Sequence, residues 1–169
     1  MENKKIAPRQ APLEIAPEDF RALGHDLVDR IANFLDSLPQ GPVTNYKTPH
    51  QLQQLLGAKE IPEHGTDPAR ILAEAAELLF EHSLFNGHPR FWGYITSSGA
   101  PIGALGDMLA ATINPNVGAW DLSPMATEIE TQTVRWIAEL IGYPSECGGV
   151  LTSGGNVANF VGFLAGRLD

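Results

Sequence analysis

One stretch of the sequence, VLTSGGNVANFVGFLAGR from Val150 to Arg167, combines residue types that could hold an anion. Val150 and Leu151 suit a short buried strand, the small and polar residues after them suit a turn, and apolar residues at helical spacing resume at Val157. The start of a helix offers unpaired backbone N–H groups and the positive end of the helix dipole. Glycines just before it let a ligand approach the backbone closely. The pattern therefore predicts an anion site suited to phosphate.

Three side chains of this turn, those of Thr152, Ser153 and Asn156, could add hydrogen-bond donors or a helix cap. A glycine turn that Asn156 caps without any ligand is the alternative that the pattern leaves open. The turn is not a P-loop, because the Gly-Lys-Ser/Thr sequence is missing. It is not a G-x-S-x-G nucleophile turn either, because Ser153 has glycine only on its C-terminal side.

Most of the remaining sequence predicts helices that begin close to a proline. Apolar residues at helical spacing between Pro17 and Leu38 give the first helix one strongly apolar face. That face packs either on its own domain or on a second subunit, and the pattern leaves both open. Further helices are expected near Gln51–Leu56, from Asp67-Pro68, over Pro101–Thr112 and from Ser123-Pro124 to just before Gly142.

Three finer expectations concern these elements. The aromatic run Phe91–Ile95 predicts a strand-like segment, and Ser123 is expected to cap the helix that it precedes. The apolar residues expected to form the buried face of that helix are Met125, Ile129, Trp136, Ile137 and Leu140.

The composition limits the classes of partner. The formal net charge of -9 disfavours nucleic acid and anionic membrane surfaces. No apolar run approaches the length of a membrane span, and the start of the chain lacks a hydrophobic signal core. Cys147 is the single cysteine and cannot form an internal disulfide, which fits a cytoplasmic location. The five histidines match no metal spacing, and His88, beside the aromatic run, is expected to have a surface or structural role.

Two short sequence blocks follow one another in the second half of the chain. The segment HPRFWGYITSSGAPIGALGDMLAATINPNVGAWDLSPMATEIETQTVRWIAELIGYP contains an S-P-x-A-T-E-x-E block, and GGVLTSGGNVANFVGFLAGR contains a T-S-G-G-x-x-A-N block. Together they resemble the N-terminal third of the group II pyridoxal-phosphate-dependent decarboxylases, which include aromatic-L-amino-acid, histidine and glutamate decarboxylases. The resemblance covers most of residues 17–168.

The resemblance implies an α/β fold, the N-terminal part of a fold-type-I enzyme in which a mostly helical segment leads into the parallel sheet of a large domain. It also implies a homodimer with an N-terminal helical segment laid across the partner subunit. The expected organisation is an extended arm at residues 1–16, a helical segment at the dimer interface at 17–66, and the start of the cofactor-binding large domain at 67–169.

Cofactor-binding residues also follow from the resemblance. The phosphate of pyridoxal 5'-phosphate would contact the backbone N–H of Gly155 and the side chain of Asn156, where relatives usually show Ser or Thr. Ser153 and Gly154 would shape the turn.

Substrate-pocket residues are implied in the same way. The aromatic loop that lines the pocket in the family falls on Tyr94, Ile95, Thr96 and Ser97. The segment that reaches into the neighbouring subunit's active site falls on Asn116, Val117 and Gly118. Some aromatic decarboxylases carry large apolar side chains at the places of Asn116 and Gly118 and an aromatic residue at Asn86, so the resemblance does not imply an aromatic substrate.

The implied activity is decarboxylation of an L-amino acid. That reaction needs a lysine that forms a Schiff base with the cofactor, which in the family follows a histidine in an N-x-H-K-type motif. The lysines of this chain, all in polar surroundings, are Lys4, Lys5, Lys47 and Lys59. None is expected to serve, so we expect no catalytic residue in this segment, which would be part of a longer enzyme and inactive alone. The alternatives are transamination or carbon–carbon bond cleavage by the same cofactor, or a truncated dimerisation module without catalysis.

Overall fold

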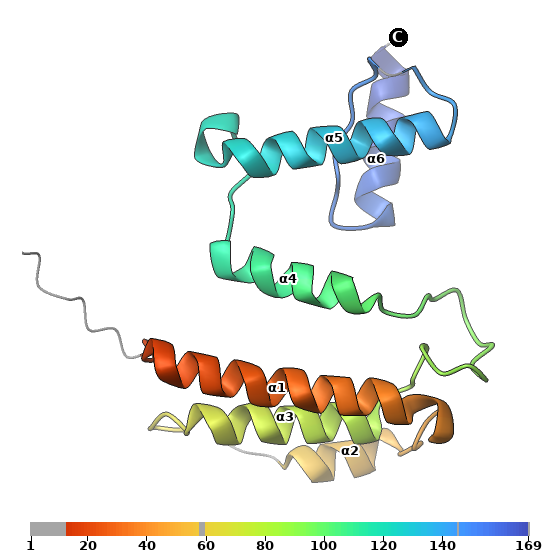
Figure 1. The fold of residues 1–169 in the computed structure, drawn as a ribbon. Helices are drawn as coiled ribbons and strands as arrows, with labels where there is room; N and C mark the ends of the chain where they lie inside the picture. The colour runs from red at the N-terminus through yellow and green to blue at the C-terminus, as the bar shows by residue number, and fades with distance from the viewer. Residues whose placement is uncertain (1–12, 58–59, 145, 169) are drawn as a thin grey trace, which may run out of the picture. The chain divides into compact units, whose positions relative to one another are not determined.

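The structure, a computed structural model, describes residues 13–57, 60–144 and 146–168 of the chain (Figure 1). Contacts group the chain into two compact units that divide between Gly99 and Ala100. The first unit contains α1 (Pro17–Ser37), α2 (Pro49–Leu56) and α3 (Pro68–His82). The second unit contains α4 (Pro101–Ile113), α5 (Pro124–Leu140) and α6 (Gly155–Leu168). Two short 3-10 turns, η1 (Leu38–Gln40) and η2 (Trp120–Leu122), follow α1 and precede α5.

Proline marks where helices α1 to α5 begin, since each has proline as its first residue. Proline suits this position because its φ angle is already helical and its missing N–H would have no partner there. The helix starts predicted at Pro17, Pro68, Pro101 and Pro124 are confirmed. The short helix expected near Gln51–Leu56 is also present and begins at Pro49.

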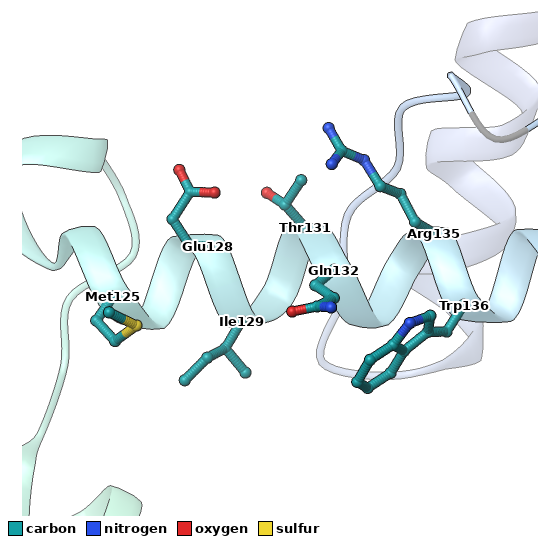
Figure 2. A pocket seen from close by; sticks show the side chains of 7 residues that line it. All are labelled: Met125, Glu128, Ile129, Thr131, Gln132, Arg135 and Trp136. Atoms are coloured by element: carbon teal, nitrogen blue, oxygen red, sulfur yellow. The ribbon is translucent and has the colours of Figure 1, made fainter.

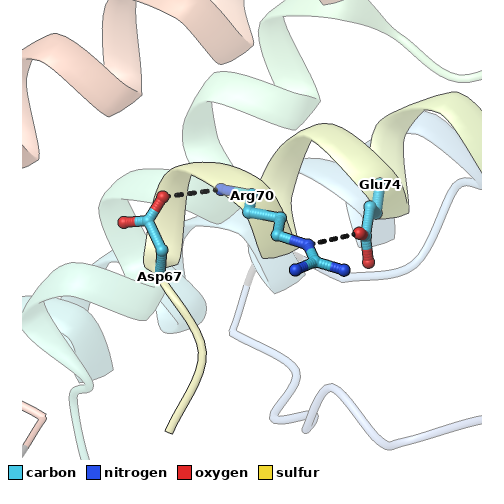
Figure 3. Close-up of polar contacts among 3 residues, drawn as sticks. All are labelled: Asp67, Arg70 and Glu74. Carbon is cyan, nitrogen blue, oxygen red and sulfur yellow. Dashed lines mark hydrogen bonds and ion pairs between the residues drawn. The ribbon is translucent and has the colours of Figure 1, made fainter.

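Side chains complete the starts of α2 and α3. At α2, Thr48 Oγ1 accepts a hydrogen bond from the backbone N–H of Gln51 at 3.3 Å, and Gln51 Oε1 accepts one from that of Thr48 at 2.9 Å. At α3, Asp67 Oδ2 accepts from the backbone N–H of Arg70 at 3.3 Å (Figure 3). Arg70 Nε donates to Glu74 Oε1 at 2.7 Å, one turn further along. This hydrogen bond, and secondly the charge of Glu74, raise the pKa of Arg70, which stays cationic.

Helices α1 and α3 pack side by side in the first unit (Figure 1). The ring of Phe34 on α1 stacks on that of Phe80 on α3, with centroids 4.5 Å apart and planes 7° apart. The same ring meets Phe85 at a centroid distance of 5.5 Å. The apolar face of α1 therefore packs on its own unit around Phe34. Exposed large apolar side chains on α1 are Phe20, Val28 and Leu35.

The segment that follows η1 is tied to the end of α3. Thr44 and Leu84 form an isolated antiparallel bridge, and the backbone N–H of Phe85 donates to the carbonyl of Val43 at 3.0 Å. The side chain of Asn45 donates from Nδ2 to the carbonyl of Glu81 at 3.0 Å. These bonds join segments that lie about forty residues apart in the sequence.

The buried side chain of His88 also joins the segment after α3 to the residue that follows η1. His88 is only 2% exposed, and its Nδ1 accepts from the backbone N–H of Arg90 at 3.0 Å. The proton therefore lies on Nε2, which donates to the carbonyl of Gly41 at 3.1 Å. Nη2 of Arg90 donates to the same carbonyl at 3.0 Å. Of the two roles expected for His88, the structure shows the structural one.

Replacing His88 by alanine should lower the free energy of unfolding by about 1–3 kcal/mol, because the N–H of Arg90 loses a buried acceptor and the carbonyl of Gly41 loses a donor. Calorimetric unfolding of the full-length protein measures this effect. The matched control is His64→Ala, at an exposed loop position, which should change stability by no more than about 0.5 kcal/mol. Equal effects of the two substitutions would contradict the structural role of His88.

Neither strand expected from the sequence forms within the described residues. In the Phe91–Ile95 run, Tyr94 has a φ angle of +60°, which interrupts an extended backbone. Val150 and Leu151 have no neighbouring strand to pair with in the described part of the chain. A strand persists only where another strand supplies its hydrogen bonds. The described residues are therefore helical, and their only β pairing is the bridge between Thr44 and Leu84.

The second unit ends its helices as the sequence predicts. α4 ends at Ile113 and is followed by Asn114, whose φ of +49° is left-handed, and α5 is followed closely by Gly142 with a φ of +79°. The start of α5 differs from the expectation. The side chain of Ser123 makes no cap hydrogen bond, and its carbonyl instead accepts from the hydroxyl of Thr127 at 2.9 Å.

Candidate functional site

The predicted anion site is a turn that opens directly onto the first residues of α6. The carbonyl of Gly154 accepts from the N–H of Ala158 at 3.0 Å, so Gly154 is the residue before the helix. Its φ of +157° is one that residues with a side chain rarely adopt. A Cβ atom added to Gly155 would meet no described atom within 4 Å. The space on the Cβ side of Gly155, at the start of α6, is therefore open.

Polar groups around this turn fit a phosphate. The hydroxyl of Thr152 donates to the carbonyl of Gly154 at 3.3 Å and so braces the turn. Within the described residues, the side chains of Ser153 and Asn156 make no hydrogen bond, which leaves their donors available. Asn156 lies inside α6, so the alternative of a turn capped by Asn156 is not what forms. The donor set and the open backbone suit an anionic group.

Helix α5 holds the peptide that leads into the turn. The backbone N–H of Leu151 donates to Glu130 Oε1 at 2.8 Å. Two residues earlier, a Cβ atom on Gly149 would lie 2.6 Å from Cγ1 of Val134, so only glycine allows this approach to α5. The other carboxylate of the S-P-x-A-T-E-x-E block, Glu128, accepts from Nε1 of Trp120 at 2.8 Å. The two acids of this block therefore hold different segments.

The predicted substrate-pocket loop lies in the first unit. Tyr94 and Ile95 are exposed, and the ring of Tyr94 meets that of Phe91 at a centroid distance of 6.5 Å. Asn86 donates from Nδ2 to the carbonyl of Ser97 at 3.3 Å, which ties this loop to the turn after α3. Thr96, between Ile95 and Ser97 in the same loop, is exposed. Tyr94, Ile95, Thr96 and Ser97 are thus presented by one exposed loop.

Asn116 lies in the second unit, in the loop between α4 and η2. Its Oδ1 accepts from the backbone N–H of Gly118 at 2.9 Å, which makes a local turn. A Cβ atom on Gly118 would stand 3.0 Å from that same Oδ1. Val117 between them is 47% exposed. The structure therefore gives Asn116 a turn-forming contact and leaves the tip of the loop accessible.

The site residues fall into groups that the two units present separately. Ser153, Gly154, Gly155 and Asn156 lie together in one turn of the second unit. Residues 94–97 lie in one loop of the first unit. Glu130 was not expected from the sequence as part of the site. The S-P-x-A-T-E-x-E block that contains it was recognised, but spacing along α5 does not show which backbone group the carboxylate meets.

A groove of about 360 Å³ runs along α5 and is lined by that helix alone (Figure 2). Glu128, Thr131 and Arg135 project from one side of the helix, and Ile129 and Trp136 from the other (Figure 2). The polar side chains do not converge on a common point, so this groove is a poor cofactor site.

The apolar side chains of α5 contradict the expected buried face. Met125, Ile129, Trp136, Ile137 and Leu140 are all exposed, with Leu140 at 85%. The expectation of a buried face was wrong for the described part of the chain, because no described segment covers these side chains. The one buried apolar residue of the helix is Ala138.

Two further properties concern the described residues alone. None of their helices combines the length and apolarity needed to cross a bilayer. None of their histidine, cysteine, aspartate and glutamate side chains gather in threes that could hold a metal ion.

Comparison with known families identifies the class of protein. Residues 49–169 match the pyridoxal-dependent decarboxylase conserved domain. The chain therefore belongs to the pyridoxal-dependent decarboxylase family, and it forms a helical N-terminal segment of that fold. Pyridoxal 5'-phosphate is the cofactor. The family resemblance expected from the sequence is confirmed.

Individual relatives agree with this assignment. The chain is 29% identical over 155 residues to an aromatic-L-amino-acid decarboxylase from Bacillus atrophaeus, covering 92% of this chain and 32% of the relative. It is 32% identical over 128 residues to a phenylacetaldehyde synthase from Petunia hybrida, covering 76% and 25%. A crystal structure of Oryza sativa TDC with PLP and tryptamine superimposes with a TM-score of 0.69 at 26% identity, covering 81% and 27%. The chain thus spans a third or less of these relatives.

Proposed function

We propose that this chain supplies the phosphate-binding turn of a pyridoxal-phosphate-dependent L-amino-acid decarboxylase. The observation that carries the proposal is the open glycine turn before α6, inside the region that matches the decarboxylase domain. When bound, the cofactor's ring accepts the electron pair that remains as a carboxyl group departs as carbon dioxide. The segment itself contributes binding and orientation.

The cofactor-binding residues of the proposal are Ser153, Gly154, Gly155 and Asn156. The backbone N–H groups of Gly155 and Asn156 would hold the phosphate at the positive end of α6. The side-chain amide of Asn156, which has no partner among the described residues, would add a further donor. The open space above Gly155 supports this arrangement, because a phosphate needs close access to the backbone.

Substrate contacts are proposed at Tyr94, Ile95, Thr96, Ser97 and Asn116. These residues are exposed in the two loops, which supports a role in contacting a substrate. The substrate class is an L-amino acid. A second candidate reaction, which would form an aldehyde with release of carbon dioxide and ammonia and would need a two-electron oxidant besides the amino acid, is favoured by the relative named phenylacetaldehyde synthase.

Assembly and location complete the proposal. A homodimer is supported by the apolar side chains that α1 leaves exposed, of which Val28 is 41% and Leu35 40% accessible. We place the protein in the cytoplasm, which its single cysteine supports.

The proposed function predicts carbon dioxide release from at least one L-amino acid by the full-length protein with its cofactor. The lysine that holds the cofactor covalently should lie outside residues 1–169, because Lys4, Lys5, Lys47 and Lys59 stand in polar sequence far from the 154–156 turn along the chain. Borohydride reduction followed by peptide mass mapping locates that lysine, and a parallel assay analyses the products.

The products separate the candidate reactions. Amine as product supports decarboxylation, whereas aldehyde supports the second candidate. A labelled lysine inside residues 1–169, or no carbon dioxide from any L-amino acid, would contradict the proposal. Residues 1–169 expressed alone should neither acquire the label nor release carbon dioxide.

A further inference from the structure

No strand forms at Val150 and Leu151 within the described residues. Helix α5 holds the peptide that leads into the Gly154–Asn156 turn instead. Its two fixed points are the hydrogen bond from the N–H of Leu151 to Glu130, at 2.8 Å, and the contact of Gly149 with Val134. Only Val150 lies between these points. The path of the backbone into the turn is therefore defined by α5.

We propose that Glu130 is a positioning residue for the cofactor: by accepting the N–H of Leu151, it sets where the Gly154–Asn156 turn presents its own N–H groups to the phosphate. This inference rests on the proposed function of that turn. Glu130 bonds the chain three residues before Gly154, and its carboxylate makes no hydrogen bond to the described residues 154–156. It acts through the backbone and is not a catalytic residue.

The chemistry of the bond explains why a side chain so far from the turn matters. A hydrogen bond from a backbone N–H to a carboxylate is charge-assisted and about twice as strong as one between neutral groups. Three residues of extended chain reach about 10 Å, which is too short for a displacement at Leu151 to be absorbed before Gly154.

The neighbouring acid provides an internal comparison. Glu128 stands two residues before Glu130 on the same helix, and such neighbours face different directions. Its carboxylate accepts from the indole of Trp120 at 2.8 Å and makes no hydrogen bond to the described residues 149–156. Loss of Glu128 should therefore disturb η2, whereas loss of Glu130 should disturb the turn.

The test uses the full-length protein freed of cofactor and then titrated with pyridoxal 5'-phosphate by absorbance. Glu130→Ala and Glu130→Asp, which remove or retract the acceptor, should raise the dissociation constant about tenfold, the range expected for losing a charge-assisted bond. Glu130→Gln keeps an acceptor oxygen at the same reach and should stay within about threefold of the wild type. Glu128→Ala is the matched control and should leave the dissociation constant unchanged.

A second readout follows the hydrogen bond directly. Amide hydrogen exchange of the peptide that spans residues 150–156, without cofactor, should be slow at Leu151 in the wild type and in Glu130→Gln, and at least about tenfold faster in Glu130→Asp and Glu130→Ala. If Glu130→Ala fails to fold, the difference in exchange rate and in cofactor affinity between Glu130→Asp and Glu130→Gln tests the proposal. An unprotected Leu151 amide in the wild type would overturn the proposal without any variant.

The failure of this inference is distinct from the failure of the proposed function. Gly155→Val tests the turn itself. If Gly155→Val weakens the cofactor but Glu130→Asp and Glu130→Gln bind it equally well, Glu130 is no positioning residue and the phosphate turn stands. If Gly155→Val leaves the dissociation constant unchanged, the turn is not the phosphate site, and the inference falls with it.

Discussion

Gly155→Val should raise the dissociation constant of pyridoxal 5'-phosphate by at least about tenfold in the full-length protein. The valine side chain would enter the space that the start of α6 leaves open, where a Cβ position at Gly155 has no atom within 4 Å beyond its chain neighbours and the helix backbone. A phosphate kept away from the N–H groups of Gly155 and Asn156 loses charge-assisted hydrogen bonds, each contributing about 1.5–3 kcal/mol. About 1.4 kcal/mol corresponds to a tenfold change in affinity.

The same open space suits this test, because the Cβ atom of the new side chain would meet no atom beyond its chain neighbours and the backbone of α6. Absorbance titration of the cofactor-free protein gives the dissociation constant, and calorimetry checks that the fold is kept. Asn156→Ser is the conservative control, since serine still offers a donor, and it should change the affinity by no more than about threefold. An unaltered titration for Gly155→Val would remove the turn from the cofactor site.

Val28→Asp combined with Leu35→Asp should convert the proposed homodimer into a monomer. These two residues lie seven positions apart on α1, so they share one face, and they are 41% and 40% exposed within the chain. Two carboxylates placed in an apolar interface would lose their hydration without gaining a partner. Sedimentation equilibrium of the full-length protein measures the change in mass.

The control for added charge is Ala22→Asp combined with Asn33→Asp. Both positions are exposed on α1 and lie on a different side of the helix from Val28 and Leu35. This variant should remain dimeric. Leu27 and Ile31 would be ambiguous targets, because they are half-buried and their replacement would also disturb packing within the first unit. A dimer that survives Val28→Asp with Leu35→Asp would show that this face of α1 is not the interface.

Local sequence signals were sufficient for the helices of this chain. Proline at a first helical position acts within a single turn, so Pro17, Pro68, Pro101 and Pro124 gave the helix starts correctly. The same is true of the turn before α6, because its glycines and its small residues act on the adjacent backbone. Whether a strand forms cannot be predicted from such local signals. The apolar pairs and runs at Phe91–Ile95 and Val150–Leu151 need partner strands, and the described residues supply none.

Contacts between distant residues account for most of what the sequence did not reveal. Glu130 meets Leu151 across twenty-one positions, and His88 meets Gly41 across forty-seven. A charged or titratable residue carries no local mark of such a partner. The apolar stripe of α5 shows the converse case, because its periodicity predicts that something covers it but not which segment does so. The division of the chain into an arm, a helical segment and a large domain stays a prediction.

The bonds that meet at the carbonyl of Gly41 also bear on how the length of this chain can vary. His88 and Arg90 close loops of 47 and 49 residues, which include α2 and the connection to α3. The entropy lost on closing a flexible loop grows only with the logarithm of its length, so even a doubling costs about 0.6 kcal/mol more. Added residues between Gly57 and Asp67 would thus hardly weaken the closure. Related sequences can therefore differ in length at this connection while they keep the same first unit.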